Sequence, residues 1–485
     1  MNAKDATRVR TALTGRNLRM PLAALSAVLV LGGCATFSAD GGFGPVEQTV
    51  KARSGRDVVW AKTDEQREAL AARTLELLAQ PLSVESAVQV ALLNNRGLQA
   101  AYYDLGISEA DLVQASRLPN PRFSMLRTRR GEDYKIEQAL TFNIFSLITM
   151  PLAREIELRR FEQAKLGAAF DALRLAADTR RAYFAAVAAD ETTRYMEQVR
   201  QAAEASADLA QRMARAGNFS RLQQAREQSF YADATAQLAR ARANAVSARE
   251  QLARLMGVWG PQLAFRLPER LPDLPKAVGE RPDLESLAMQ QRLDLQSVRA
   301  QLEGLGRNLG LTRTTRFLNA LEFGPARVLE GERSEPYKNG YDIAFEIPIF
   351  DFGSTRVAKA EAIYMQAVER ATETAINARS EVREAYHTYR TQYDLAKHYR
   401  DEVVPLRKRI SEENQLRYNG MLIGVFELLA DARAQISSVA SYIDALRDFW
   451  IAQSNLEMSL VGRPGGAVAI APAAAAQAGG EAAGH

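Results

Sequence analysis

Cysteine is nearly absent from this chain, which has one, Cys34, in 485 residues. A single thiol excludes a disulfide within the chain and a metal centre built from cysteines. Histidine is scarce too, and the two internal histidines, His387 and His398, lie about 16 Å apart along one predicted helix. That separation is too large for both to bind one ion. We therefore expect no metal site and no cofactor.

Catalytic motifs are missing as well. The sequence has no P-loop, no dinucleotide-binding glycine fingerprint and no nucleophile elbow. We predict that the chain is not an enzyme. A hydrolase is disfavoured for the same reason.

Cys34 lies directly after a segment with the order of a bacterial export signal. Basic residues come first, and an apolar run, Met20–Val30, follows; that run is shorter than the ~20 residues that span a bilayer. Leu31-Gly32-Gly33-Cys34 is similar to a bacterial lipobox, whose cysteine is acylated and becomes the N-terminus. We expect residues 1–33 to be a lipoprotein signal peptide and Cys34 to carry lipid such as palmitate. The alternative is a free thiol after an ordinary signal peptide.

Removal of this signal would change the charge of the protein. The full chain has 62 Lys and Arg against 58 Asp and Glu, and residues 1–33 hold five basic residues and one acid. The remainder would have 57 charges of each sign. The basic character belongs to the signal, so we expect no nucleic-acid binding.

Two long helical stretches dominate the remaining sequence. Residues 152–215 contain no proline and would form a helix of roughly 95 Å, and Ser354–Tyr418 contains one, Pro405. Apolar and small residues recur at 3-4 spacing in both stretches, which predicts coiled-coil seams. The seam positions are Leu166, Ala169, Leu173 and Ala176 in the first stretch, and Val357, Ala360, Tyr364, Ala367, Ala371, Thr374 and Ala378 in the second.

Two other stretches alternate between apolar and polar residues, which is typical of strands with one apolar face. We expect the apolar set to face lipid: Tyr134, Ile136, Phe142, Ile343 and Phe345. We expect the polar set to face water: Lys135, Glu137, Asp342 and Glu346. A hairpin partner is predicted upstream of each strand, near Pro121–Arg129 and Arg316–Glu330. The chain would then have four strands in two hairpins.

The two halves of the chain repeat each other. Phe142 and Phe345 are 203 residues apart, as are Gly217 and Gly420. Each repeat reads helix, hairpin, long helix, turn, helix. We divide the chain into a signal peptide (1–33), a lipid anchor with a tether and a short helix (34–80), a first repeat (81–260), a proline-rich connector (261–282), a second repeat (283–463) and a disordered tail (464–485). The tether (35–63) should lack regular structure because of Gly41–Pro45, and the short helix should cover Asp64–Ala79. Ser83 can cap the next helix, which should run to about Arg117.

Four strands cannot close a barrel, and their edges would stay unpaired in lipid. Two copies of the chain would give eight strands, whose side chains fill the interior, whereas three copies would give twelve strands and room for a pore. We therefore predict a mainly α fold with a β-barrel part. In it, long coiled-coil hairpins form an α-barrel that continues a trimeric, 12-stranded membrane barrel as a tube.

Over roughly residues 81–461 the chain resembles the TolC family of outer-membrane efflux factors, in its lipid-anchored branch. The local signatures are PLSVESAVQVALLNN, LPNPRF, FEIPIFDFGSTR and RYNGMLIGVFELLADAR. The chain departs from the family at two helix starts, with Leu293 in place of the proline of an Arg-Pro-Asp-Leu motif and Arg96 where proline is common. The resemblance implies the channel of a tripartite export system: a homotrimer in outer-membrane lipid, a periplasmic adaptor (membrane fusion) protein and an inner-membrane pump of the RND type.

The resemblance also gives roles to the turns between long helices. The predicted adaptor-docking tips are Gly217, Asn218, Phe219, Gly420, Met421, Leu422, Ile423 and Gly424. Gly217 and Gly420 are expected to be left-handed helix caps, and the apolar trio that follows Gly420 is expected to be exposed. Glu427, Asp431 and Arg433 follow the second tip and match the region that closes the periplasmic mouth in the family. A simple solvated face is the alternative for these three residues.

A second class of function stays open at this point. A lipid-anchored periplasmic scaffold or adaptor would have the same anchor and coiled coils and would not span the membrane. The alternating strands disfavour it, because a scaffold needs no apolar sheet face. The exported cargo, whether drugs, solvents, heavy-metal cations or peptides, does not follow from the sequence.

The lipobox gives a first prediction. Cys34→Ser should abolish palmitate labelling and leave an unprocessed or mislocalised precursor, because the acylated atom is the cysteine sulfur. Metabolic labelling of the variant beside the unmodified protein measures this. Unchanged labelling of the variant would refute the anchor.

Overall fold

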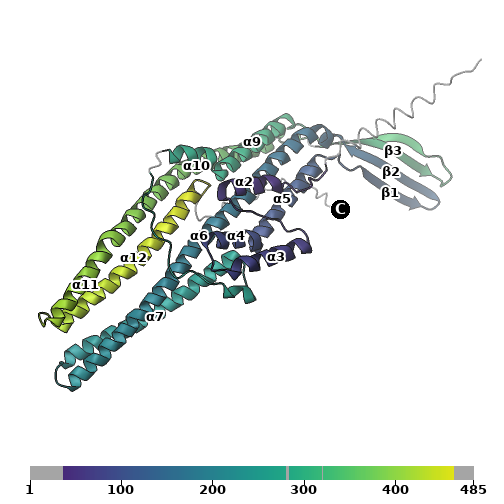
Figure 1. Ribbon diagram of the computed structural model, residues 1–485. Coiled ribbons are helices and arrows are strands. Elements are labelled where there is room, and N and C mark those ends of the chain that lie inside the picture. The colour runs from purple at the N-terminus through teal and green to yellow at the C-terminus, as the bar shows by residue number, and fades with distance from the viewer. Residues whose placement is uncertain (1–35, 280–282, 319, 464–485) are drawn as a thin grey trace, which may run out of the picture. The chain divides into compact units, whose positions relative to one another are not determined.

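The computed structural model describes residues 36–279, 283–318 and 320–463 (Figure 1). The predicted signal peptide, Cys34 and the predicted tail (464–485) lie outside these residues. The chain forms two compact units. One contains Ser108–Leu158 and Gly306–Glu361, and the other contains Asp40–Ile107, Arg159–Leu305 and the chain from Ala362 onward. No helix in the described part is both long and apolar enough to cross a membrane.

The first unit holds one antiparallel sheet in the order β1-β2-β3-β4. Its strands are β1 (Arg122–Arg130), β2 (Asp133–Asn143), β3 (Leu321–Gly331) and β4 (Lys338–Phe345). The two predicted hairpins are thus confirmed, and β2 pairs with β3, from Tyr134 opposite Gly331 to Asn143 opposite Glu322. One hairpin from each repeat therefore contributes to a single sheet.

The helices follow the predicted repeat order. The first repeat contains α4 (Val84–Asn94), α5 (Arg96–Ala115), α6 (Ile144–Arg215) and α7 (Arg221–Met256), and a 3-10 turn (Gly260–Ala264) follows. The second contains α8 (Leu284–Gln291), α9 (Leu293–Thr314), α10 (Ser354–His398), a π turn (Tyr399–Val403), α11 (Val404–Asn419) and α12 (Val425–Ser459). In each half a helix leads into a hairpin, a long helix, a turn and a returning helix.

Proline acts differently in the two long stretches. α6 spans 72 residues and includes Pro151, so it begins before the predicted start at Leu152. In the second stretch, Pro405 lies in the first turn of α11, directly after the π turn. Because proline has no N–H to donate, the widened turn absorbs the missing hydrogen bond and the stretch divides into two helices.

The expected tether contains a helix, α2 (Phe43–Ser54), so the prediction of irregular structure across residues 35–63 was wrong. Phe43, Val46 and Val50 are buried. Gly42 has φ +74°, and a Cβ there would lie 2.3 Å from the Phe161 ring. Gly42 therefore allows the backbone to pack closely against Phe161 of α6, and the glycines do not prevent a helix.

Two helix starts near residues 64 and 84 agree with the sequence. α3 (Asp64–Ala79) has the predicted bounds, and the side chain of Ser83 caps α4. One helix was expected from Ser83 to about Arg117, but it is broken at Asn95. The Nδ2 atom of Asn95 donates to the Leu255 carbonyl at 2.9 Å, while its Oδ1 atom accepts from the Leu98 N–H at 2.9 Å.

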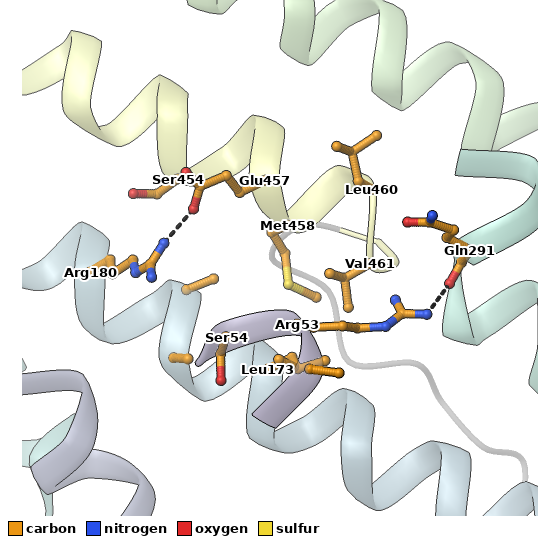
Figure 2. Close-up of a pocket in the computed structure, with 13 residues that line it drawn as sticks. Arg53, Ser54, Leu173, Arg180, Gln291, Ser454, Glu457, Met458, Leu460 and Val461 are labelled. Atoms are coloured by element: carbon orange, nitrogen blue, oxygen red, sulfur yellow. Dashed lines mark hydrogen bonds and ion pairs between the residues drawn. The ribbon is translucent and has the colours of Figure 1, made fainter. Parts of the chain in front are cut away.

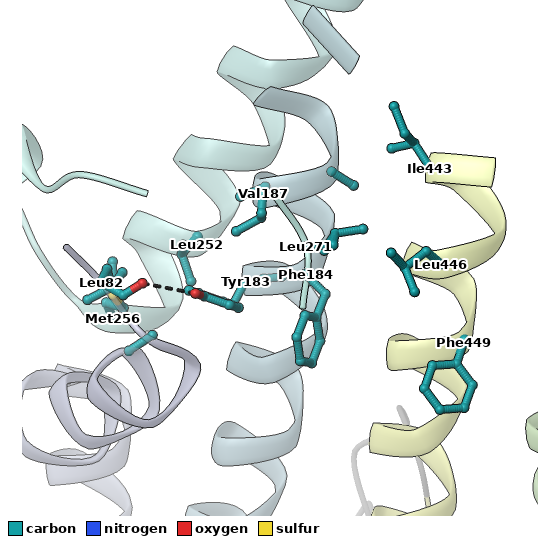
Figure 3. Packing of buried hydrophobic residues seen from close by; sticks show 14 of the residues in the cluster. Leu82, Tyr183, Phe184, Val187, Leu252, Met256, Leu271, Ile443, Leu446 and Phe449 are labelled. Atoms are coloured by element: carbon teal, nitrogen blue, oxygen red, sulfur yellow. Dashed lines mark hydrogen bonds between the residues drawn. The ribbon is translucent and has the colours of Figure 1, made fainter. Parts of the chain in front are cut away.

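The main core of the second unit joins both repeats (Figure 3). Phe184 of α6 stacks on Trp450 of α12, with ring centroids 5.3 Å apart. The Tyr183 hydroxyl donates to the Leu82 carbonyl at 2.9 Å. Connector residues Phe265, Leu271 and Leu274 are also buried in this cluster. The proline-rich connector is thus part of the core, and burial of each such side chain is worth about 1.5–3 kcal/mol.

A buried arginine links three helices of the second repeat. Arg292, between α8 and α9, has 1% of its side chain exposed. Its guanidinium binds both carboxylate oxygens of Asp294, at 3.0 and 2.6 Å, and reaches Glu381 of α10 at 2.8 Å. It also donates to the Ser459 carbonyl of α12 at 3.2 Å. The carboxylates of Asp294 and Glu381 and the Ser459 carbonyl thus compensate the buried positive charge of Arg292.

We expect Arg292→Ala to lower the free energy of unfolding by about 3–5 kcal/mol, because it leaves the buried Asp294 carboxylate without its cation. Glu381 is less affected, since it also pairs with Arg463 at 3.6 Å. Arg383→Ala is the matched control: its ion pair with Glu285 is exposed (61% and 44%), so the loss should stay below about 1 kcal/mol. Denaturant unfolding followed by circular dichroism measures both. Equal losses in the two variants would contradict a structural role for the buried cluster.

Candidate functional site: sheet face and hairpin tips

The strand register places most large hydrophobic residues of the sheet on one face, with Leu126 and Val328 on the other. Phe142 lies opposite Phe323, which lies opposite Ile343, and directly opposed residues share a face. We define the apolar face by Phe123, Leu140, Phe142, Phe323, Tyr341, Ile343 and Phe345. These side chains are 38–72% exposed. Isolated exposed hydrophobic residues are ordinary, but a contiguous set of seven indicates a surface that is covered in the working protein.

The register also places all five predicted lipid-facing residues on this face, including Tyr134 and Ile136. The alternate positions carry charges: Lys135 and Glu137 form an ion pair at 2.8 Å, and Asp342 lies on the same side. Glu346 comes directly after the end of β4. Contact of the apolar face with lipid itself stays a prediction.

The sheet has two open edges. The order β1-β2-β3-β4 gives the outer sides of β1 and β4 no strand neighbour among the described residues. Each edge presents a row of N–H and C=O groups that can pair with another chain. The apolar face and the edges are therefore both incomplete in one copy of the protein.

The two hairpin tips differ in their backbone. Gly217, after α6, has φ +80°, as predicted for a left-handed cap, and the Asn218 N–H donates to the Met213 carbonyl at 3.0 Å. Gly420 has φ −78°, so the prediction of a left-handed cap was wrong there. Met421 takes the left-handed conformation, with φ +57°.

The second tip is strongly apolar at its surface. Met421 and Leu422 are 93% and 74% exposed, while Ile423 is half-buried. A side chain with a Cβ is uncommon at positive φ, where it costs roughly 1–2 kcal/mol. The chain thus holds Met421 in an unfavourable backbone conformation that leaves its thioether in solvent.

The three residues predicted to close the mouth do not interact as a group. Glu427 is exposed in the first turn of α12, whereas Asp431 accepts a hydrogen bond from Asn414 of α11. Asp431 therefore has a structural partner within its own hairpin, which the sequence did not indicate.

Arg433 turns to the other hairpin. Its Nη2 atom lies 3.1 Å from Oε1 of Glu227 on α7, and its guanidinium lies 4.2 Å from the centroid of the Phe230 ring. Glu227 is buried and also accepts a hydrogen bond from Ser206 of α6 at 2.9 Å. One charged cluster thus joins α6, α7 and α12.

Sequence reasoning missed Glu227, although a signal was present. Glu227 begins a 3-4 series that continues through Phe230, Ala234, Leu238 and Ala241, of which the last three are buried. An acid at an otherwise apolar seam position needs a buried partner. Which basic residue supplies it depends on the packing of distant helices.

A cavity of about 480 Å³ lies between α2, α6 and α12 (Figure 2). Leu173, Ala176 and Met458 line it, and Arg53 donates to the Gln291 carbonyl at 2.6 Å across one side. Its lining contains no nucleophile with an adjacent base. In the described part of the chain, no group of three or more histidine, cysteine or acidic side chains is placed to hold a metal.

The comparisons with known proteins agree with this arrangement. No protein-family profile matches the chain. The cobalt-zinc-cadmium resistance protein CzcC of Cupriavidus metallidurans is 26% identical over 278 residues, which is 56% of this chain and 64% of CzcC. The match thus spans slightly less than two thirds of that relative.

Solved structures share the fold over a larger part of the chain. One is CusC, whose structures concern the conformational changes that accompany folding and transmembrane channel formation. It has a TM-score of 0.66 and 16% identity, over 78% of this chain and 92% of CusC. The outer membrane protein VceC of Vibrio cholerae has a TM-score of 0.64 and 14% identity, over 78% and 96%. These relatives are channel and membrane proteins rather than enzymes. With its two hairpins in one sheet and its repeated long helices, the chain has the fold of the TolC family of outer-membrane channels.

Proposed function

We propose that this protein is the outer-membrane channel of a tripartite efflux system. Three copies form a passive exit duct that docks to a periplasmic adaptor and an inner-membrane RND-type pump. The observation that carries the proposal is the four-stranded sheet, with its exposed apolar face and its two open edges, on the same chain as the long helical hairpins. The long helices form the periplasmic tube.

Closure of the sheet supports three copies. In hydrocarbon each unpaired backbone group costs several kcal/mol, so the outer edges of β1 and β4 must pair with neighbouring chains. Two sheets of four strands would make a barrel filled by its own side chains, whereas three leave a passage. The charged face, with Lys135, Glu137 and Asp342, then lines water. An SDS-resistant, heat-modifiable trimer in outer-membrane fractions tests this closure.

The scaffold alternative is disfavoured by the exposed side chains of the sheet. Phe345 and Tyr341 are 58% and 72% exposed, and a periplasmic scaffold would present them to water. Acylation of Cys34 belongs to the proposal as a second attachment to the outer membrane.

The tips are the proposed docking surface for the adaptor. Met421 and Leu422 form an apolar pair on a turn that is held in position by main-chain hydrogen bonds, one of which runs from the Leu422 N–H to the Arg417 carbonyl at 2.8 Å. The Gly217–Phe219 turn is the corresponding surface of the first repeat.

The mouth of the tube is the proposed gate. Threefold symmetry would arrange Glu427 and Asp431 in rings around the axis, where like charges repel and attract cations. The pair of Arg433 with Glu227 fastens the second hairpin to the first, so it favours the closed arrangement. Opening then requires this pair to separate.

The cargo we favour is a divalent metal cation, because the relative CzcC is named for resistance to cobalt, zinc and cadmium. A wide duct does not need to bind what it conducts, so the scarcity of histidine and cysteine is compatible with this cargo. A sensitivity panel of metals and drugs on a deletion strain decides the class: sensitivity to drugs alone would overturn the metal proposal.

Phe345→Arg should impair trimer assembly, at a cost of roughly 2–4 kcal/mol if the side chain lies near the bilayer midplane. Ala344→Arg is the matched control, because Ala344 lies opposite Glu322 on the charged face and should tolerate arginine. Trimer yield on unheated SDS gels compares them. The barrel proposal fails if cysteine labelling shows both faces equally accessible to water.

Replacement of Glu427 and Asp431 together by alanine should leave trimer levels normal, because alanine is a good helix former. In planar bilayers the variant should show weaker cation selectivity and higher, less cation-blocked conductance. Wild-type values for all three properties would show that the acids are only a solvated face.

Arg433→Ala should raise the open probability about fivefold, since a partly buried ion pair is worth ~1 kcal/mol. Glu227→Gln should have a similar effect. Arg200→Ala, which removes an ion pair with Glu204 within one helix, is the control and should gate like the unmodified protein. Single-channel recordings that show no change in the first two variants would exclude the fastening role.

A further inference from the structure

Beyond the channel itself, we propose that the apolar face ends in a binding site for anionic, phosphate-bearing lipid head groups such as those of lipopolysaccharide. The site is a cluster of three arginines and two tyrosines at the hairpin ends of the strands, which we call the cationic rim: Arg127, Arg129, Arg327, Tyr134 and Tyr337. This inference rests on the proposed function, because the rim meets head groups only if the apolar face meets lipid.

The strand register places the rim beside the apolar face. Arg127 and Arg129 of β1 lie opposite Ile136 and Tyr134 of β2, and Arg327 of β3 lies opposite Gln138. These positions lie on the same face as Phe123, Leu140 and Phe323, which are nearer the ends of the strands that connect to the helices. Along this face, apolar side chains are therefore followed by arginine side chains toward the hairpin turns. A membrane has the same order, with a hydrocarbon interior followed by a polar interface.

The arginines are oriented by aromatic rings. The guanidinium carbons of Arg127 and Arg129 lie 5.7 and 5.1 Å from the centroid of the Tyr134 ring, and that of Arg327 lies 4.9 Å from Tyr337. Arg327 also donates from Nε to Gln138 at 2.6 Å, and Arg129 donates from Nε to the Gly131 carbonyl at 2.7 Å. In both residues the Nε atom is engaged, which leaves the paired Nη groups to form a bidentate contact with phosphate.

Charge complementarity identifies the ligand as an anion. No aspartate or glutamate of the four strands occupies the face that carries the three arginines, whereas five acids lie at strand positions of the opposite face: Asp133, Glu137, Glu322, Glu330 and Asp342. Arg127 and Arg129 are separated by one strand repeat, ~7 Å, and Arg327 lies two strands away, ~10 Å. Arginines at such spacing, beside the half-buried Tyr134 and the exposed Tyr337, match phosphate groups held at a membrane surface.

The test uses the full-length trimer with Arg127, Arg129 and Arg327 all replaced by glutamine. The matched control, Arg122→Gln with Arg130→Gln and Lys338→Gln, removes three charges from the opposite face. Each protein is reconstituted in vesicles of phosphatidylcholine, with or without lipopolysaccharide, and the amounts of each lipid retained by the re-extracted trimer are measured separately. We expect the rim variant to retain about tenfold less lipopolysaccharide than the unmodified protein and the control to retain the normal amount.

Three outcomes would overturn the inference: equal retention by the rim variant, equal loss by the control, or as much retention from phosphatidylcholine alone. Each of these leaves an SDS-resistant trimer in place, so it contradicts the lipid site and not the channel. Failure of the unmodified protein to form a trimer would instead contradict the proposed function. The two failures are therefore distinguishable.

Discussion

Every hydrogen-bonding group of a peptide backbone needs a partner where water is excluded, and in the proposed membrane barrel this constraint accounts for most of the sheet unit. Pairing of β2 with β3 joins the hairpins of both repeats, so one copy of the chain has two open edges rather than four. The β2–β3 pairing is interrupted only near Gly324 and Pro325. Proline cannot donate there, and a Cβ on Gly324 would lie 1.9 Å from the Leu140 carbonyl oxygen. The irregularity thus lies where proline lacks a donor and where glycine lets the backbones of β2 and β3 approach closely.

The helical unit depends on a different compensation, that of buried charge. Arg292 and Glu227 are each about 1% exposed, and each is paired with more than one polar group from other helices. Apolar seams made largely of alanine allow helices to approach but specify their register weakly. A buried ion can be satisfied in one arrangement only, so we attribute part of the register of α7 against α12, and of α9 against α10, to these two residues. The two clusters differ in strength: Arg292 is enclosed, whereas Arg433 is 37% exposed and can leave Glu227 at a smaller cost.

Repetition of the chain gives similar parts different roles. Both repeats contain a turn between long helices, but the first turn uses Gly217 at positive φ and the second uses Met421. The second hairpin also contains the π turn before Pro405, and its exposed tip is the more apolar one. In the proposed duct, such differences would allow the second hairpin to move while the first remains part of the wall.

Local features of the chain could be predicted from the sequence, because their causes lie within a few residues. Alternation identified the apolar face of β2 and β4, proline-free 3-4 spacing identified the long helices, and Ser83 identified a helix start. The prediction of secondary structure failed where contacts with residues distant in the sequence outweighed the local pattern. Gly41–Pro45 looked like a helix breaker, yet Phe43 and Val46 gain a buried environment that favours α2.

Pairings between distant segments were decided only by the tertiary structure. The contacts of Asp431 with Asn414 and of Arg433 with Glu227, like the β2–β3 pairing, join residues 17 to about 200 positions apart. Sequence periodicity determines which side of a helix or strand is apolar. It does not determine against which other helix or strand that side packs. That choice is made by the simultaneous burial of all such faces, since a charge or a strand edge is stable only against a partner supplied elsewhere in the fold.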